Sequence, residues 1–406
     1  MRVLVMTKIF PNQREPGSSP FNRLQFAALS RLCPLDVLAT IPWFPGGQAF
    51  QRWSPAARLS DVPQQESIDG LSVRHPRFLY LPRVGHGIAG ALYAASLAPT
   101  VLRYRGRVDV LLGSWAYPDG FAAVVLAGLL GVPAVVKVHG SDLNVLAELP
   151  GPRRRMEWAL PRAARVVAVS RPLGEVAASL GVERDRIDIV KNGIDRELFR
   201  PRDRAAARRA LGLPADVPIV LYVGHLAKAK GALDLIRAFS IGRDALGGAQ
   251  LVMLGDGADQ AACRDLCAEL GVRASLVGAQ PHARVPEWLA ACDLLALPSW
   301  AEGTPNVVLE ALASGRRVVA SSVGGIPDVI DKKELGALVP PRDPAALASA
   351  LAEALQTPYD PEQVSNSLPW PDWEGSARAL HQSLLAALED RARDTLARTY
   401  PATQAA

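Results

Sequence analysis

The segment DLLALPSWAEGTPNVVLEALASGRRVVAS (residues 293–321) contains two short apolar runs with a helical pattern between them. The runs at 293–297 and 317–320 are continuous in Leu, Val and Ala, which is typical of parallel strands buried on both faces. Between them, Thr304 is suited to cap a helix, Pro305 to occupy its first position and Gly315 to follow its end. The segment therefore predicts a strand, a helix and a second strand of one parallel sheet.

The same alternation recurs along the 406 residues of the chain. Strand-like runs are found at 2–6, 35–41, 108–112, 134–138, 165–169, 187–190, 218–223, 250–254, 293–297, 317–320 and 336–339. Helical patterns separate them, which predicts an α/β protein with doubly wound parallel sheets. There are too many strands for one ordinary sheet. We therefore expect two similar domains at 1–198 and 199–368, followed by an amphipathic helix and a tail within 369–406.

Composition excludes several classes of protein. Hydrophobic residues make up 49% of the chain, and no low-complexity tract or fixed glycine period is present, which argues against disordered and collagen-like proteins. Four cysteines are too few for a disulfide scaffold, and Cys263 and Cys267 fit one buried helix face better than a metal site. The uncharged stretches 84–102 and 120–136 are too short and too broken to span a membrane, and the start lacks a secretory pattern. These features predict a soluble, cytoplasmic protein.

Charge is distributed unevenly between the two halves of the chain. The net charge is +5, with +9 over residues 1–200 and −4 over the remainder. A basic half indicates an anionic partner or an anionic membrane surface, and nothing in the pattern points to a nucleic acid. The apolar segment 83–107, which has arginines at both ends, fits either a bilayer-binding helix or a core helix of the first domain. We favour the core helix.

Ligands bind open parallel sheets beyond the carboxyl ends of the strands, so the loops that follow strands are the candidate site. A helix beginning at Pro305 would direct the N–H groups of Asn306 and Val307 at an anion. Glu310 lies about 9 Å farther along the helix, within reach of a ribose whose phosphates occupy the helix start. Glu302 would then face the far end of the same ligand. Surface and capping charges are the plain alternative for both carboxylates.

A glycosidase is a second interpretation of Glu302 and Glu310. Its two carboxylates would have to lie about 5–5.5 Å apart in a retaining enzyme or about 6.5–9.5 Å apart in an inverting one. The largely helical path between the two residues gives a separation of about 12 Å or less. This separation disfavours a glycosidase but does not exclude one.

The loop after the strand at 218–223 has the sequence GHLAKAKG. Gly224 permits a tight turn, and His225, Lys228 and Lys230 supply cations that would neutralise a diphosphate without a metal. An ordinary solvated loop has the same composition.

Two positions in the first half are further candidates. His139 ends the buried strand of AVVKVHGSD, where an imidazole is well placed to contact a ligand, although a lone histidine is more often structural. Gly17 lies in the loop REPGSSP before the first helix, where its backbone could approach a phosphate or simply connect two elements.

Several common motifs are absent or incomplete. GHGIAG (85–90) matches G-x-G-x-x-G, but no strand ends directly before it and no acid ends the next strand, so a dinucleotide role is disfavoured. The chain has no Walker A loop, no H-E-x-x-H and no Asp-x-Asp pair. No metal ligands are therefore predicted.

Taken together, these motifs resemble those of the retaining family 4 glycosyltransferases of the GT-B fold, the glycosyl transferases group 1. The resemblance covers nearly the whole chain and rests on FPNQREPGSSPF, VHGSD, VKNGID, LYVGHLAKAKG, LVMLGDG and PSWAEGTPNVVLEALASGRRVVASSVGGIPDVI, in which two glutamates are eight positions apart. It implies two Rossmann-like domains facing a central cleft, with the first domain on the acceptor side and the last helix returning to it.

The resemblance also implies an activity, namely metal-independent transfer of a hexose-type sugar from a nucleoside-diphosphate sugar with retained configuration, and no cofactor. By this analogy Glu310 holds the ribose, Asn306 and Val307 bind the distal phosphate, Glu302 and His139 contact the sugar, Lys230 stabilises the leaving diphosphate, and Gly17 approaches it. The chain departs from the family at His225, where the family usually has arginine, so His225 or Lys228 would have to take its place.

The expected acceptor is a sugar or a lipid-linked precursor of a polysaccharide, with peripheral contact at the inner face of the membrane. Two alternatives remain. A sugar-nucleotide epimerase of the same fold would need no acceptor, and a catalytically silent nucleotide-sugar binder would release no nucleotide.

Overall fold

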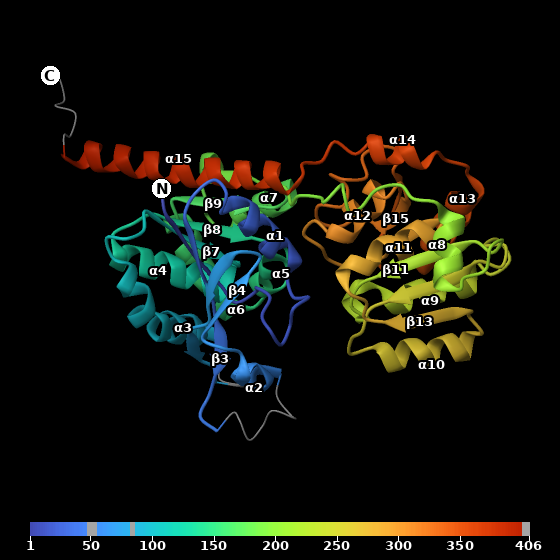
Figure 1. Cartoon of the computed structure of the whole chain (residues 1–406), viewed down its shortest axis with the longest axis horizontal. Helices are drawn as coiled ribbons and strands as arrows, with labels where there is room; N and C mark the ends of the chain where they lie inside the picture. The colour runs from blue at the N-terminus through green and yellow to red at the C-terminus, as the bar shows by residue number, and fades with distance from the viewer. Residues whose placement is uncertain (47–54, 82–85, 400–406) are drawn as a thin grey trace. The chain divides into compact units, whose positions relative to one another are not determined.

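A computed structural model describes residues 1–46, 55–81 and 86–399, and the chain divides into two compact units (Figure 1). The first unit combines Met1–Gly193 with Trp373–Ala406, and the second comprises Ile194–Asp372. The sequence places the corresponding boundaries after residues 198 and 368. Each unit is built around its own parallel sheet.

The first unit contains an eight-stranded sheet in the order β10-β9-β8-β7-β1-β2-β5-β4. Its strands are β1 (Val3–Thr7), β2 (Leu35–Ala39), β4 (Gln65–Ile68), β5 (Leu71–Arg74), β7 (Val110–Ser114), β8 (Ala134–Val138), β9 (Arg165–Ala168) and β10 (Ile187–Ile189). All neighbours are parallel except β4 and β5, which form an antiparallel hairpin at the edge. A separate parallel pair is formed by β3 (Ile41–Trp43) and β6 (Arg77–Leu79).

Helices cover both faces of this sheet because alternate strand residues point to opposite sides. Val3 and Val5 of β1 face a core shared with α1 (Pro20–Leu29) and α15 (Trp373–Thr399), whereas Leu4 and Met6 face α3 (His86–Val101) and α4 (Phe121–Leu130). The remaining helices of the unit are α2 (Pro55–Arg58), α5 (Ser141–Asn144), α6 (Pro150–Ala159) and α7 (Arg171–Ser179). In Figure 1, α15 runs along one side of the unit and α3 and α4 lie on the other.

The second unit contains a six-stranded, fully parallel sheet in the order β13-β12-β11-β14-β15-β16. Its strands are β11 (Ile219–Val223), β12 (Gln250–Leu254), β13 (Ala274–Gly278), β14 (Leu294–Leu297), β15 (Arg317–Ser321) and β16 (Gly336–Val339). Its helices are α8 (Arg204–Leu211), α9 (Ala232–Ile241), α10 (Gln260–Leu270), α11 (Val285–Ala291), α12 (Asn306–Ala313), α13 (Pro344–Gln356) and α14 (Pro361–Asn366). The predicted doubly wound α/β architecture is therefore confirmed in both units.

Several smaller predictions concern particular segments. Gly87 and Gly90 lie within helix α3, while Gly85 is outside the described residues. Tyr93 and Leu97 of this helix are fully buried, so the segment is a core helix of the first unit, as favoured. All four cysteines are buried free thiols, and Cys263 and Cys267 share the buried side of α10. Among the residues described, no helix is long and apolar enough to cross a membrane.

Candidate functional site

The loops at the carboxyl ends of β11 and β12 are held together by their backbones. The amide of Gly224 donates to the carbonyl of Leu254 at 3.0 Å, and that of Leu226 donates to Asp256 at 2.8 Å. Gly255 has φ +131°, and a Cβ built there would lie 2.0 Å from the carbonyl oxygen of Gly224. Only glycine allows this approach, so the two loops form one rigid edge.

Lys230 and Glu302 form an ion pair at this edge. Lys230 ends a short 3₁₀ turn after β11, and Glu302 lies in the loop between β14 and α12. The Nζ of Lys230 is 2.7 Å from Oε1 of Glu302, and the Ser299 hydroxyl donates to the same oxygen at 2.7 Å. The Glu302 side chain is only 10% exposed, whereas that of Lys230 is 34% exposed. The ammonium is therefore held by Glu302, while part of the Lys230 side chain faces solvent.

Close backbone approaches set the position of this pair. A Cβ at Gly231 would lie 1.9 Å from the carbonyl oxygen of Pro298, and one at Gly324 would lie 1.9 Å from that of Glu302. In addition, the amide of Trp300 donates to the carbonyl of Ala229 at 2.9 Å. The loops carrying Lys230 and Glu302 are therefore locked to each other and to the loop after β15.

Helix α12 begins at Asn306, one residue later than predicted. Pro305 has an extended conformation (φ −72°, ψ 120°) and occupies the N-cap position. The prediction that Thr304 caps the helix and Pro305 opens it is therefore wrong, because ψ of Pro305 is outside the helical range. The amide of Val308 donates to the carbonyl of Pro305 at 3.1 Å, and the amides of Asn306 and Val307 lie in the first turn of the helix.

Glu310 is paired with a histidine that the sequence analysis missed. Nε2 of His282, which follows β13, lies 2.8 Å from Oε1 of Glu310. The side chain of Glu310 is 14% exposed and that of His282 is 29% exposed. The pair therefore connects the loop after β13 with helix α12. Because β13 was not predicted, no signal placed His282 after a strand.

His225 and Lys228 are more loosely held. The His225 side chain is 79% exposed and its Nδ1 lies 3.8 Å from Oδ1 of Asp256. Lys228 stacks its ammonium over the ring of Trp300 at 5.6 Å from the centroid. Both side chains are therefore exposed beside the loops that carry the Lys230–Glu302 pair.

His139 is part of a buried polar chain in the first unit. Its Nε2 lies 2.8 Å from the Ser114 hydroxyl, which donates to Oδ1 of Asn22 at 3.1 Å. The Asn22 amide nitrogen donates to the carbonyl of Ile9, which fixes that side chain with its oxygen toward Ser114. The single hydroxyl proton is then used, so Nε2 of His139 must donate and its Nδ1 is left as the acceptor. Burial, aided by Lys137, lowers the pKa of His139 well below its usual value, so the ring is neutral.

Asp142 holds the strand end that carries His139. Its buried carboxylate accepts from the amides of His139 at 3.0 Å, Gly140 at 2.7 Å and Ala116 at 2.9 Å. The sequence analysis did not single out Asp142. Gly17, by contrast, lies in a turn where a Cβ would meet no atom within 4 Å, so its neighbourhood is open.

A second carboxylate, Asp119, was also missed. It is fully buried in the turn after β7, where its Oδ1 accepts from the Lys8 amide at 2.6 Å and the Tyr93 hydroxyl at 2.9 Å. Its Oδ2 has no hydrogen-bond partner among the described residues. Burial raises the pKa of Asp119 to about 6. A cavity of about 490 Å³ lies beside this turn, at the carboxyl ends of β1 and β2, and is lined by Lys8, Thr40 and Tyr117 among others.

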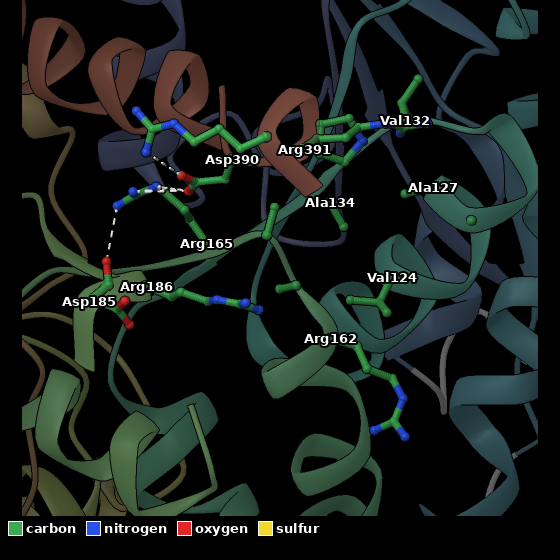
Figure 2. A pocket seen from close by; sticks show the side chains of 15 residues that line it. Val124, Ala127, Val132, Ala134, Arg162, Arg165, Asp185, Arg186, Asp390 and Arg391 are labelled. Carbon is green, nitrogen blue, oxygen red and sulfur yellow. Dashed lines mark hydrogen bonds and ion pairs between the residues drawn. The ribbon is translucent and has the colours of Figure 1, made fainter. Parts of the chain in front are cut away.

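A second cavity, of about 510 Å³, lies at the amino-terminal ends of strands in the first sheet (Figure 2). It opens at the first residues of β8 and β9 and is lined by several arginines. Arg165 donates to Asp390 of α15 at 3.1 Å and to Asp188 at 3.1 Å, and Figure 2 shows Arg165 and Asp390 pointing toward each other. These ion pairs connect α15 to the sheet. The cavity lies at the amino-terminal ends of the strands, whereas the candidate site residues follow their carboxyl ends.

The predicted site residues therefore form two groups, one in each unit. The second unit carries Gly224, His225, Lys228, Lys230, Glu302, Asn306, Val307 and Glu310 at the carboxyl ends of its strands. The first unit carries His139 after β8 and Gly17 before α1. An ammonium, a helix start and a buried carboxylate on one rigid edge have the chemistry to bind a phosphorylated sugar. Within the ranges that the structure describes, no group of three or more His, Cys, Asp or Glu side chains is arranged to hold a metal ion.

Two family models match the chain. The model for Glycosyltransferase Family 4 matches residues 50–198, and that for Glycosyl transferases group 1 matches residues 217–357. Curated relatives agree. The chain is 30% identical over 371 residues to the putative teichuronic acid biosynthesis glycosyltransferase TuaC of Bacillus subtilis, covering 90% of each chain. It is 36% identical over 328 residues to the D-inositol 3-phosphate glycosyltransferase of Mycobacteroides abscessus, covering 76% of this chain and 73% of that one.

Solved structures with the same fold include HepE from Anabaena in complex with UDP, with a TM-score of 0.67 and 20% identity, covering 98% of this chain and 100% of that one. Sucrose-phosphate synthase from Thermosynechococcus elongatus has a TM-score of 0.71 and 20% identity over the same shares of the two chains. HepE has also been solved with UDP-glucose.

Proposed function

Because this chain belongs to the family 4, group 1 glycosyltransferases and has their GT-B fold, we propose that it transfers a hexose from a nucleoside-diphosphate sugar with retention of anomeric configuration and without a metal. The observation that carries this proposal is the Lys230–Glu302 pair, held at 2.7 Å beside the start of α12.

The chemistry of the transfer fits this pair. When the glycosidic bond to the diphosphate breaks, negative charge develops on the leaving phosphate. The Lys230 ammonium and the amides of Asn306 and Val307 would stabilise that charge without reorganising, because the loops that carry them are locked. Glu310, whose carboxylate accepts a hydrogen bond from His282, would bind the ribose hydroxyls.

We assign the remaining candidates to the donor as well. His139 and Glu302 would hydrogen-bond to the sugar, His139 through its unprotonated Nδ1. Gly17 and Gly224 would let the backbone approach the diphosphate. In the position where the family usually has arginine, His225 is largely exposed, and Lys228 lies nearby as the alternative cation.

The acceptor is the less constrained partner. We propose a sugar or lipid-linked precursor of a polysaccharide, bound by the first unit, with the enzyme acting in the cytoplasm and contacting the anionic inner face of the membrane. The excess of basic residues in the first 200 positions supports this assignment. One relative is itself named for teichuronic acid biosynthesis.

Two experiments together test the proposed function. Isothermal titration with UDP, UDP-glucose and other nucleotide sugars should reveal one donor that binds, and the sugar-nucleotide and acceptor products should then be analysed by NMR. We expect nucleotide release that depends on an acceptor, and a glycoside with the donor's anomeric configuration. Conversion of the nucleotide sugar alone would instead indicate an epimerase. Binding without nucleotide release across an acceptor panel would indicate a silent binder, and an inverted product would contradict retention.

A further inference from the structure

A third cavity, of about 460 Å³, lies at the amino-terminal ends of strands in the second unit. Pro218 directly precedes β11, Asp293 directly precedes β14 and Arg316 directly precedes β15, and all three residues line the cavity. The residues assigned to the donor follow the opposite, carboxyl ends of these strands. From Asp293 to Pro298, across β14, the chain advances about 16 Å at the rise of a strand. The cavity is therefore separate from the donor residues.

The charged side chains of this cavity are mostly cationic. Arg202, Arg204 and Arg316 line it, and Asp293 is the one carboxylate among the described residues that do so. Asp293 is already neutralised, because Arg204 bonds to its Oδ1 and Arg208 donates to its Oδ2 at 2.6 Å. Within the described ranges of the chain, no carboxylate lies within ion-pair distance of Arg202 or Arg316. Two of the lining arginines therefore have no counter-charge of their own.

Arg316 is the buried member of this group. It is only 3% exposed, and its guanidinium donates to the carbonyls of Leu289 at 3.0 Å and Ala290 at 3.1 Å, near the end of α11. These carbonyls orient the side chain, but they supply only partial negative charges. Because arginine stays protonated inside proteins, a buried guanidinium is costly unless a full negative charge compensates it. An anion in the cavity would provide that charge.

The remaining wall leaves the two arginines available to a ligand. Tyr359 lines the cavity, but its hydroxyl donates to the carbonyl of Asp293 at 2.5 Å and is thereby used. The guanidinium of Arg317 lies over the Tyr359 ring, 5.9 Å from its centroid, which adds a further cation beside the cavity. The carboxylates of Asp203 and Asp360, which neighbour lining residues in the sequence, cap helices α8 and α14. The acids around the cavity are therefore already committed to other partners.

We propose that this cavity binds the phosphate group of a small molecule between Arg202 and Arg316. Guanidinium groups pair with phosphate oxygens through two parallel hydrogen bonds, and a phosphate ester carries about −1.5 to −2 charge at neutral pH. That charge matches the two arginines that lack a counter-charge, whereas a monocarboxylate would neutralise only one. Inorganic phosphate and a phosphorylated metabolite share this chemistry. The site goes beyond the proposed transferase function, because a strand length separates it from the donor residues.

Isothermal titration of the full-length protein in phosphate-free buffer tests this proposal. Inorganic phosphate, glucose 1-phosphate and acetate would be added separately to the wild type, to Lys230→Ala and to Arg202→Ala. We expect phosphate binding that is unchanged in Lys230→Ala and at least about tenfold weaker in Arg202→Ala, because a charged hydrogen-bond donor is lost. The tighter-binding phosphate compound identifies the source of the ligand. Absence of phosphate binding, or acetate binding of equal strength, would overturn the proposal.

Two arginines of helix α8 provide a matched comparison. Arg204 lines the cavity, whereas Arg209 is exposed and is not part of the lining. Each substitution by alanine removes one positive charge from the same helix. Arg204→Ala should weaken phosphate binding, and Arg209→Ala should leave it unchanged. Equal weakening by the two substitutions would indicate attraction by the general surface charge and would contradict a built site.

Unfolding in urea guards against a folding defect and gives a second measurement. Arg202 is exposed and has no ion-pair partner, so Arg202→Ala should unfold near the wild-type urea concentration when phosphate is absent. Phosphate should then raise the unfolding midpoint of the wild type more than that of Arg202→Ala, since a ligand of the folded state stabilises it. The general salt effect of phosphate is common to both proteins. Equal rises would show that Arg316 only caps α11 and that the cavity holds no phosphate.

Failure of this inference is distinguishable from failure of the proposed function. Phosphate binding that Arg202→Ala weakens and Lys230→Ala preserves would establish the cavity site even if no sugar were transferred. Sugar transfer by a protein that binds no phosphate at this cavity would support the transferase and refute the inference.

Discussion

Lys230 places a cation on the rigid sheet edge of the second unit, 2.7 Å from Glu302. If it stabilises the leaving diphosphate, Lys230→Ala should lower turnover by about 10²–10³-fold, the loss typical of one preorganised donor in a transition state. The change is measured as kcat with a saturating donor identified by titration. Lys332→Ala, an exposed lysine of the same unit, is the control. Turnover within a few-fold of the wild-type value would remove Lys230 from its assigned role.

Lys137 gives a pH prediction. Its side chain is fully buried and hydrogen-bonded to Gln25, and burial lowers its pKa to about 7. In the unfolded chain the amine keeps its proton to about pH 10.4. Between these values the unfolded chain binds more protons, so the contribution of Lys137 to stability rises with pH from about 7 to about 10 and is lost as pH falls toward 7.

The measurement is urea unfolding of the wild-type protein and Lys137→Met at pH 6.5 and 9.5. The free energy of unfolding of the wild type, relative to the variant, should be greater at pH 9.5. Lys332→Met, which alters an exposed amine, should show no such change between the two pH values. A difference between wild type and Lys137→Met that is the same at both pH values would contradict the burial argument.

The sequence predicted the positions of some candidate site residues and missed others. His139, Lys230 and Glu302 follow strands, and their positions were predicted from the apolar runs before them. Asp119 and Asp142 were not singled out, because a carboxylate that satisfies backbone amides has no distinctive neighbours in sequence. His282 was missed because the strand before it, Ala274–Gly278, is only partly buried and lacks a strong apolar run.

Loops position the residues proposed to bind the donor sugar nucleotide. The loop that carries Glu302 is closely approached by Gly324. Gly324 has φ +54°, and a Cβ there would lie 1.9 Å from the Glu302 carbonyl oxygen. Gly324→Ala should therefore displace the Glu302 loop, destabilise the protein by more than the ~1–2 kcal/mol of left-handed strain alone, and weaken donor binding.

Gly212 provides the comparison for this substitution. It also has positive φ, at +65°, but a Cβ there would meet no atom within 4 Å. Gly212→Ala should cost only the strain, about 1–2 kcal/mol, and leave donor affinity unchanged. Urea unfolding and calorimetry with the donor check both variants. Equal losses of stability and unchanged donor affinity in Gly324→Ala would refute the close-approach argument.

Helix and strand boundaries agree with those predicted from the sequence where a local capping or apolar pattern exists. Helix α12 begins one residue after the predicted position, because Pro305 caps the helix with extended geometry instead of opening it. The hairpin β4–β5 was not predicted, since β5 alternates between buried and exposed residues over only four positions and β4 has no buried residue. Short strands at a sheet edge carry too few apolar residues to be told from loops.

At the scale of the whole chain, the last helix belongs to the first unit. Leu380 of α15 is fully buried in a core with residues of β1, β7 and α1. Leu380→Ala should lower the free energy of unfolding by about 2–5 kcal/mol and leave donor affinity of the folded protein unchanged.

Leu385 is the control on the same helix, because it is 39% exposed. Leu385→Ala should change stability by less than about 1 kcal/mol. Urea unfolding at one pH compares both variants with the wild type. If Leu380→Ala unfolds at the wild-type urea concentration, the packing of α15 described here is wrong.

The sequence by itself determined the α/β class, the parallel sheets and the strand-end loops that carry the candidate residues. These depend on apolar periodicity and on glycine and proline positions, which are properties of neighbouring residues. Only the tertiary structure decided that Glu302 pairs with Lys230 and Glu310 with His282, that the strand end carrying His139 is held by Asp142, and that an apolar cavity lies beside Lys8. These features join segments far apart in the chain or depend on side-chain packing, which local patterns do not encode.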